Sequence, residues 1–403
     1  MKTDLHINVL SAIKEVSAVA WDACANPSTS ASGVAPQAAC AAAPYNPFIS
    51  HAFLNALEAS RSATAKSGWQ PQHLVAAVEQ QIVGVVPCYL KSHSRGEYVF
   101  DQGWADAYER AGGSYYPKLQ VSVPFTPATG RRLLVANEPD TNEIRKGLAA
   151  GLVELCRLHS ASSVHVTFAT SHECRTLGEC GFLQRTDQQF HFENPGYGSF
   201  EDFLEALASR KRKTIRRERR EAVAAGISIE WLTGADLTES VWDAFFAFYM
   251  ETGSRKWGRP YLTRSFYSLI GQTMSDRILL VMAKRNARYI AGAINFIGSD
   301  TLYGRHWGAV EAHPFLHFEV CYYQAIEYAI AHRLARVEAG AQGEHKLSRG
   351  YLPVTTYSAH HIADPGLRRA IGDYLLRERA YVDAAGRELA QAAPFRRDPA
   401  VES

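Results

Sequence analysis

The chain has 403 residues, of which 46% are hydrophobic, and its 43 Lys and Arg nearly balance its 41 Asp and Glu. This length is enough for two ordinary domains with full cores, and the balanced charge leaves the choice of partner to local charge clusters. The seven cysteines form no C-x-x-C pair, which favours reduced thiols and predicts no metal site. With no apolar run of about 18 residues and no signal peptide, we expect no membrane span and a cytoplasmic protein.

Residues 1–45 are expected to begin the first domain with a strand at 5–10 and a helix at 11–24. A mobile segment rich in Ala, Ser and Pro follows at 27–44. Order resumes at residue 46, and the apolar spacing after Ser50 predicts a helix at 50–60 with this serine as its N-cap. We place the first domain at 46–195 and the second at 196–403.

Two parts of the chain resemble each other in their pattern of apolar runs. The first covers residues 73–105 and the second 278–308. Each is predicted to form two strands and a third strand that ends on a tryptophan, Trp104 in the first copy and Trp307 in the second. This pattern favours an internal duplication of one α/β unit, although any two antiparallel meanders share such features.

Between the copies, Tyr116 and Lys118 are candidate substrate contacts, with a packed rim as the alternative for the tyrosine. The spacing of Ile144, Leu148 and Leu152 predicts a helix at 142–159. Strands are expected at 163–168 and 182–192. The first domain is thus predicted to mix strands and helices.

A long basic helix is predicted at 200–225. Eight of the eleven residues from Arg210 to Arg220 are cations, and only Glu218 is acidic. A solvated face and a seat for phosphate groups are both open interpretations. For the second we select the following residues: Arg212, Lys213, Arg216, Arg217 and Arg220.

The stretch 303–350 combines strand, helix and polar loop. An apolar face from Phe318 to Ile330 predicts a helix on whose stripe Cys321 lies, and residues 334–338 read as a strand. The loop 340–350 carries three glycines among acidic, imidazole and cationic side chains, which is typical of loops that hold functional groups. A strand at 354–360 and a helix at 367–388 are expected to end the fold.

The motifs around these residues resemble the FemAB-like proteins of the GNAT N-acyltransferase superfamily. They are Arg305-His306-Trp307-Gly308, the run Leu316 to Tyr323, Gly340 to Lys346, Arg349-Gly350 and the basic run Ser209 to Arg220. The resemblance covers most of residues 46–385. It implies an α/β (α+β) fold of two tandem GNAT-like domains, each with a mostly antiparallel sheet flanked by helices. It also implies a peptidoglycan-linked protein.

Acyl transfer to an amine needs a base and a group that stabilises the oxyanion. We predict the catalytic candidates Glu344, His345, Glu338 and His306. We predict the substrate contacts Arg305, Trp307, Lys346, Arg349, Tyr303, Tyr116 and Lys118. Salt bridges within the loop and packing of His306 beside Trp307 are the structural alternatives.

The leading hypothesis is an N-acyltransferase with no permanently bound cofactor. Its donor is acyl-CoA or aminoacyl-tRNA, and its acceptor is an amine-bearing small molecule or cell-wall precursor. No Arg/Gln-x-x-Gly-x-Gly/Ala turn precedes the helices at Asn142 or Phe318, so the donor stays open. The alternatives are a non-catalytic pair of domains that binds RNA or a precursor, and a structural protein with a basic partner surface. The oligomeric state is undefined by the sequence.

Overall fold

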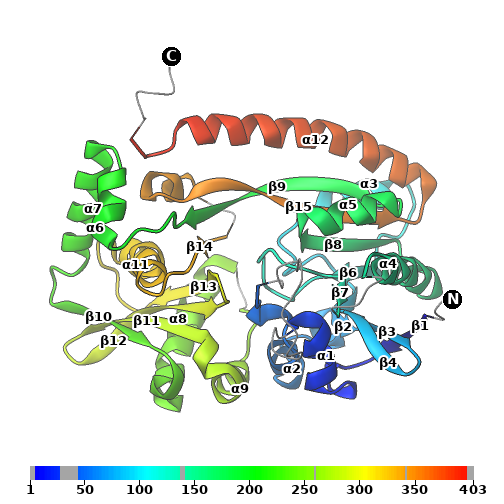
Figure 1. Cartoon of the computed structure of the whole chain (residues 1–403), viewed down its shortest axis with the longest axis horizontal. Coiled ribbons are helices and arrows are strands. Elements are labelled where there is room, and N and C mark those ends of the chain that lie inside the picture. The colour runs from blue at the N-terminus through cyan, green and yellow to red at the C-terminus, as the bar shows by residue number, and fades with distance from the viewer. Residues whose placement is uncertain (1–4, 28–43, 137–140, 258–259, 341–342, 397–403) are drawn as a thin grey trace, which may run out of the picture. The chain divides into compact units, whose positions relative to one another are not determined.

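The computed structural model describes residues 5–27, 44–136, 141–257, 260–340 and 343–396 (Figure 1). The chain forms two compact units. The first consists of Met1–Asp187, Tyr261–Phe266 and Thr356–Val382, and the second of Gln188–Pro260, Tyr267–Thr355 and Asp383–Ser403. Sheets flanked by helices occur in both units, which confirms the α/β class. The predicted domain limits at 45/46 and 195/196 stay predictions.

The first unit contains a four-stranded sheet of order β1-β3-β4-β7 and the strands β15-β8-β6-β5-β2. Its strands are β1 (His6–Leu10), β2 (Trp69–Pro71), β3 (His73–Val78), β4 (Gln81–Val86), β5 (Cys88–Lys91), β6 (Lys118–Val121), β7 (Leu134–Val135) and β8 (Ser163–Ala169). Its helices are α1 (Ala18–Ala25), α2 (His51–Ala59), α3 (Gln102–Arg110), α4 (Thr141–Leu158) and α5 (Ser171–Glu179).

The second unit contains the strands β10-β11-β12-β13-β14-β9, antiparallel except for the pair β13 and β14. Its strands are β10 (Ile227–Leu232), β11 (Ile278–Arg285), β12 (Arg288–Ile297), β13 (Thr301–Ala309) and β14 (Arg336–Glu338). Its helices are α6 (Phe200–Ala206), α7 (Ser209–Ala222), α8 (Glu239–Trp257), α10 (Leu316–Phe318) and α11 (Gln324–Ala331). Four elements contribute residues to both units: β9 (Leu183–Glu193), α9 (Arg264–Met274), β15 (Leu352–Ile362) and α12 (Pro365–Gln391).

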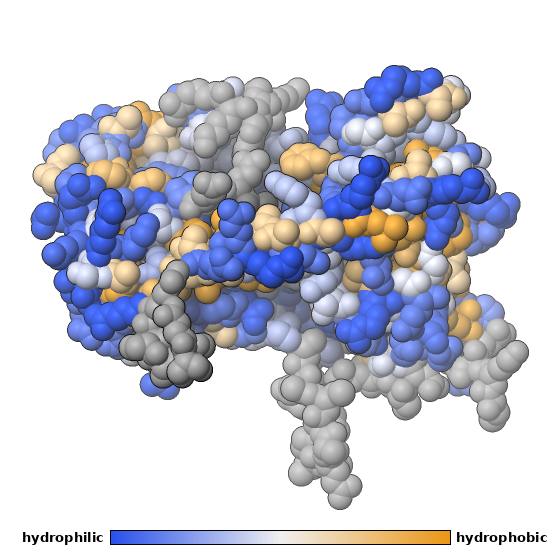
Figure 2. All heavy atoms as spheres, turned by 90° about the horizontal axis from the view of Figure 1, so that it is seen from above, coloured by the Kyte–Doolittle hydropathy of each residue, from blue (hydrophilic) through white to orange (hydrophobic). Residues whose placement is uncertain are grey.

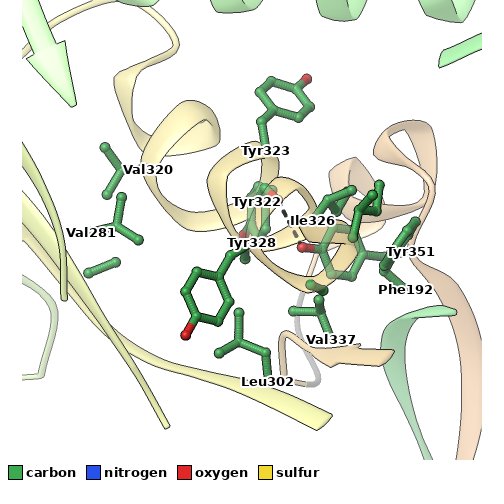
Figure 3. Packing of buried hydrophobic residues seen from close by; sticks show 14 of the residues in the cluster. Phe192, Val281, Leu302, Val320, Tyr322, Tyr323, Ile326, Tyr328, Val337 and Tyr351 are labelled. Atoms are coloured by element: carbon green, nitrogen blue, oxygen red, sulfur yellow. Dashed lines mark hydrogen bonds between the residues drawn. The ribbon is translucent and has the colours of Figure 1, made fainter. Parts of the chain in front are cut away.

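Helices α8 and α11 cover opposite faces of the strands β11 to β13 (Figure 1). Figure 3 shows the α11 side, where Tyr322, Ile326 and Tyr328 lie over Leu302 and Val337. On the other face α8 lies so close to β13 that a Cβ atom at Gly308 would stand 2.1 Å from the backbone oxygen of Phe248. Gly308 is therefore required by the close approach of a helix.

Several predicted elements differ from the structure in type. The prediction of a third strand in the first copy is wrong. Tyr98 has φ 61°, a left-handed conformation that cannot continue a strand, and helix α3 begins at Gln102. The long basic helix is divided, because Leu207 is extended and forms a bridge with Phe395. The helix at 11–24 is likewise interrupted, with Ser17 capping α1. The segment 28–43, predicted to be mobile, lies outside the described residues.

Candidate active site

A small polar cavity of about 100 Å³ lies in the second unit, between β13 and the helical segment that follows it. A wider pocket of about 460 Å³ shares Trp307 and His317 with it. The rings of these two residues lie 5.1 Å apart. Among the other residues lining the small cavity are Arg305, His306, Cys321 and Tyr322. Of the predicted residues, the structure thus brings Arg305, His306 and Trp307 together.

A β-bulge explains how consecutive residues of β13 reach one cavity. His306 pairs with Ile294 and Gly304 with Asn295, so Arg305 is the extra residue on its strand. Side chains of a regular strand alternate between faces, whereas a bulge redirects them and is frequent beside active sites. The bulge therefore places Arg305 and His306 on the same cavity.

A π-helical turn forms the opposite wall. Residues Glu319–Tyr323 adopt π-helix between α10 and α11. Such turns are rare and are frequently found at functional sites. Cys321 and Tyr322, neighbours in this turn, both line the cavity. The prediction that Cys321 belongs to the apolar stripe is thus incomplete, since the residue is only partly buried and also borders the cavity.

His306 packs edge-on against the ring of Tyr249, with the centroids 5.0 Å apart. Burial, and then the charge of Arg305, lower its pKa to about 3. The imidazole is therefore neutral at pH 7 and a weak proton acceptor. This environment favours a hydrogen-bonding role toward a ligand in the cavity.

His345 is linked to the cavity through Tyr322, whose hydroxyl lies 3.0 Å from Nε2 of the histidine. His345 is an exposed residue, but partial burial of its imidazole, followed by the charges of Arg349 and Lys346, lowers its pKa. The side chain of the neighbouring Glu344 lies outside the described part of the structure. Tyr322 can therefore pass a proton between the cavity and His345, which the sequence did not indicate.

Lys346 and Arg349 are both buried. The Nζ of Lys346 donates to the carbonyl oxygens of Ala339 at 2.6 Å and Gly340 at 3.0 Å, and burial lowers its pKa to about 8. Ala339 also lines the cavity, so this amine lies directly behind the cavity wall. Arg349 instead holds Glu218 and lies 3.5 Å over the ring of Phe318, which supports a structural role.

Glu338 and Tyr303 do not line the cavity. Strand alternation accounts for Glu338, because its neighbours Val337 and Ala339 are the ones that face the cavity. The Oε2 of Glu338 lies 4.0 Å from Nε2 of His191, whose pKa burial lowers to about 4. Tyr303 is buried beside this carboxylate, and burial first, then Glu338, raise its pKa.

Tyr116 and Lys118 belong to a different cluster, in the first unit. The ammonium of Lys118 is fully buried and donates to Ser94 Oγ at 2.8 Å, to Glu97 Oε2 at 2.7 Å and to Asp101. The hydroxyl of Tyr116 contacts the same Ser94 oxygen at 2.8 Å. Sequence reasoning missed both acids because they lie 21 and 17 residues before Lys118, with no periodic signal.

Helix α7 presents most of its cations to solvent. Lys213, Arg216, Arg217 and Arg220 are exposed, and Arg212 is partly buried. Arg216 pairs with Glu201, and Arg217 Nε lies 3.8 Å from Glu221. Exposed pairs of this kind contribute little stability, so an incoming anion can displace them. Within the described residues, no cluster of His, Cys, Asp and Glu suits a metal ion, and no helix is long and apolar enough to cross a membrane.

The chain belongs to the FemAB-like family, described as peptidoglycan biosynthesis/recognition, which it matches over residues 12–397. Its predicted FemAB-like resemblance is thereby confirmed. The sequence matches no curated protein.

Three solved structures are similar to the chain at low sequence identity. FemX has a TM-score of 0.48 and 11% identity, over 78% of this chain and 93% of its own. A tandem GNAT protein from the clavulanic acid biosynthesis pathway has a TM-score of 0.44 and 13% identity, over 90% and 99%. L-PGS from Bacillus licheniformis has a TM-score of 0.48 and 7% identity, over 78% and 87%.

Proposed function

We propose that this FemAB-like protein is an N-acyltransferase acting on an amine of a cell-wall precursor. The observation that carries the proposal is the cavity where the bulged Arg305 meets His306, Trp307 and Tyr322. Membership of a peptidoglycan-linked family supplies the substrate class. Because a fold alone does not define a reaction, the proposal depends on these side chains.

The cavity offers the groups that acyl transfer requires. The guanidinium of Arg305 is a donor for the oxyanion that develops on the attacked carbonyl. Tyr322 and His345 form a path by which the amine can lose its proton. The wider pocket beside Trp307 has room for the acceptor.

The donor's phosphates are assigned to α7. Its exposed cations can hold either the pyrophosphate of an acyl-CoA or the backbone of an aminoacyl-tRNA. Both donors are cytoplasmic, so the reaction is placed in the cytoplasm. Neutralising Arg217 and Arg220 is expected to weaken donor binding and to reduce its salt dependence.

An assay with two alternative donors and one acceptor tests the proposed transfer. The full chain is incubated with acetyl-CoA or with bulk aminoacyl-tRNA, together with a muramyl-peptide precursor bearing a free amine. Mass spectrometry then measures the mass added to the precursor. Arg305→Gln is expected to reduce turnover at least about 100-fold. Arg288→Gln, an exposed arginine on β12, serves as the matched control and should leave turnover unchanged.

A second candidate is a non-catalytic binder of RNA or of a phosphorylated precursor. The exposed cations of α7 favour it. It predicts no mass increment with either donor, together with tRNA affinity that falls steeply with salt and with Arg217→Ala. Equal turnover by the wild type and Arg305→Gln would show that transfer does not take place in this cavity.

A further inference from the structure

The first unit has a surface groove of about 650 Å³ that the proposed reaction does not use. One wall is the end of α5 and the start of β9, including Phe182, Leu183 and Gln184, and the other is α12. Figure 2 views the face that carries α12 and shows hydrophobic residues scattered among hydrophilic ones. The groove lies wholly within the first unit.

Three arginines on α12 line the groove, against one acid. Arg368 Nη2 donates to the carbonyl oxygen of Gly181 at 2.7 Å, and Arg379 donates to that of Gln184. Arg369 is exposed, as is Asp373. Carbonyl oxygens orient a guanidinium without cancelling its charge. The groove therefore keeps a net positive charge that suits an anion.

The same groove has an apolar side. Phe182 and Leu375 are buried in its walls, whereas Leu376 is 62% exposed. The groove therefore combines an exposed hydrocarbon side chain, that of Leu376, with three guanidinium groups. Sites of this size commonly bury a small ligand against apolar walls with a few polar groups for orientation.

Gly372 keeps the groove open where it crosses α12. It lies inside α12, where glycine is less favourable than alanine. A Cβ atom there would meet only Leu183 Cδ2, at an ordinary 3.8 Å, so packing within the protein does not require glycine. The absent side chain instead leaves the groove open between the arginines and Leu183.

From these observations we propose that the groove binds an anionic amphiphile, a hydrocarbon chain with a phosphate or carboxylate head. The head group is held by Arg368, Arg369 and Arg379, and the chain runs over Gly372 along Leu183 and Leu376. The site is separate from the proposed transferase reaction and stands without it. The amphiphile can be a bilayer lipid or a free molecule, which experiment separates.

Isothermal titration of the full chain with dodecyl phosphate, below its micelle concentration, tests the proposal. Inorganic phosphate and dodecyl maltoside are separate titrants that carry only the anion or only the chain. We expect dodecyl phosphate to bind at least about tenfold more tightly than either, because only it fills both halves of the groove. Equal binding of all three titrants overturns the proposal.

Variants then locate the site. Gly372→Met fills the groove with a good helix former, so it should abolish binding while keeping or raising the melting temperature. Arg369→Glu should weaken binding at least about tenfold, and Arg377→Glu, an exposed arginine on α12 outside the groove, should not. Equal losses for the two arginine variants, or unchanged binding by Gly372→Met, would overturn the assignment to this groove.

Co-sedimentation with lipid vesicles shows whether the ligand is a bilayer lipid or a free amphiphile. If the protein co-sediments with phosphatidylcholine vesicles containing one quarter phosphatidylglycerol, and Arg369→Glu does not, the groove takes a bilayer lipid. If only dodecyl phosphate binds, the ligand is a free amphiphile. Co-sedimentation with pure phosphatidylcholine at the same level contradicts an anion-directed site.

Discussion

Glu218, the acidic residue within the basic run, forms a buried ion pair with Arg349. The Nη2 of Arg349 lies 2.8 Å from both carboxylate oxygens, and the hydroxyl of Tyr323 donates to the same carboxylate. The pair ties α7, whose other charged residues are mainly cations, to the loop behind the cavity. Glu218 therefore lies on the inward face of α7, and the exposed face keeps most of the cations.

Removing one member of this pair is expected to be costly. Glu218→Gln leaves the Arg349 charge buried without its partner, and such changes destabilise proteins by about 3–5 kcal/mol. Urea unfolding would measure the loss. The double variant Glu218→Gln, Arg349→Met should lose less than the sum of the single variants. Strict additivity would show that the ion pair does not contribute to folding.

Protonation of the buried Lys346 amine is predicted to destabilise the protein as the pH falls. Its folded pKa of about 8 lies below the value of about 10.4 for an unfolded lysine. The unfolded state therefore binds the proton more tightly, and stability present above pH 10.4 is lost as the pH falls through 8. Relative to Lys346→Met, the wild type should lose about 2 kcal/mol of unfolding free energy between pH 9.5 and 7.5.

Urea unfolding at the two pH values checks the Lys346 prediction. Lys346→Arg is the control, because arginine keeps its charge over the whole range and should show no such slope. If the unfolding free energies of the wild type and Lys346→Met change in parallel with pH, burial does not lower the pKa of this amine.

His165 is expected to make the first unit sensitive to acid. Burial, and then the charge of Lys118, lower its pKa to about 3, with Asp101 opposing and Arg185 adding to the shift. His360, whose Nδ1 lies 2.8 Å from Nδ1 of His165, is also held neutral by burial. Because the unfolded histidine has a pKa of about 6.5, stability present above that pH is lost as the pH falls toward 3.

The expected loss from His165 is about 2 kcal/mol between pH 7 and 5. Unfolding of the wild type and His165→Gln at both pH values measures it as a difference. The variant should be less stable at pH 7 but should show a shallower fall. A variant with the same slope as the wild type would place the acid sensitivity elsewhere.

Cys321 should be the cysteine that reports on occupation of the cavity. It borders the cavity, whereas Cys88, Cys156 and Cys174 are buried, with pKa values raised by that burial. Iodoacetamide is expected to modify Cys321 at least about tenfold faster than these three, because they are buried and their raised pKa values keep them as thiols, whereas the thiolate is the reactive form. Peptide mass spectrometry gives the rates.

A ligand in the cavity should protect Cys321 from iodoacetamide and leave Cys180 unaffected. Cys180 is partly buried in the first unit and is the internal control. If a donor that supports turnover leaves the Cys321 rate unchanged, the donor does not occupy this cavity.

Periodic patterns in the sequence predicted most elements correctly. The strands β11 to β13, helix α4 and the Ser50 cap of α2 follow from apolar spacing and local hydrogen bonding, which act between residues near in sequence. The third strand expected at Tyr98 failed because its left-handed backbone, rather than its apolar side chains, decides the local structure. The predicted residues Arg305, His306 and Trp307 are consecutive in the chain and all line the cavity, and their functional role stays a prediction.

By itself, then, the amino-acid sequence determined the α/β class, the FemAB-like family and three residues of the cavity. Tertiary structure decided which polar residues border the cavity. The bulge at Arg305 and the π-helical turn at Cys321 change the direction of side chains without changing the apolar pattern. Lys118 and Arg349 are buried, and each pairs with an acid that is distant in sequence: Lys118 with Asp101, and Arg349 with Glu218. Such pairings depend on long-range packing, so no local rule can separate a buried ion pair from an exposed binding residue.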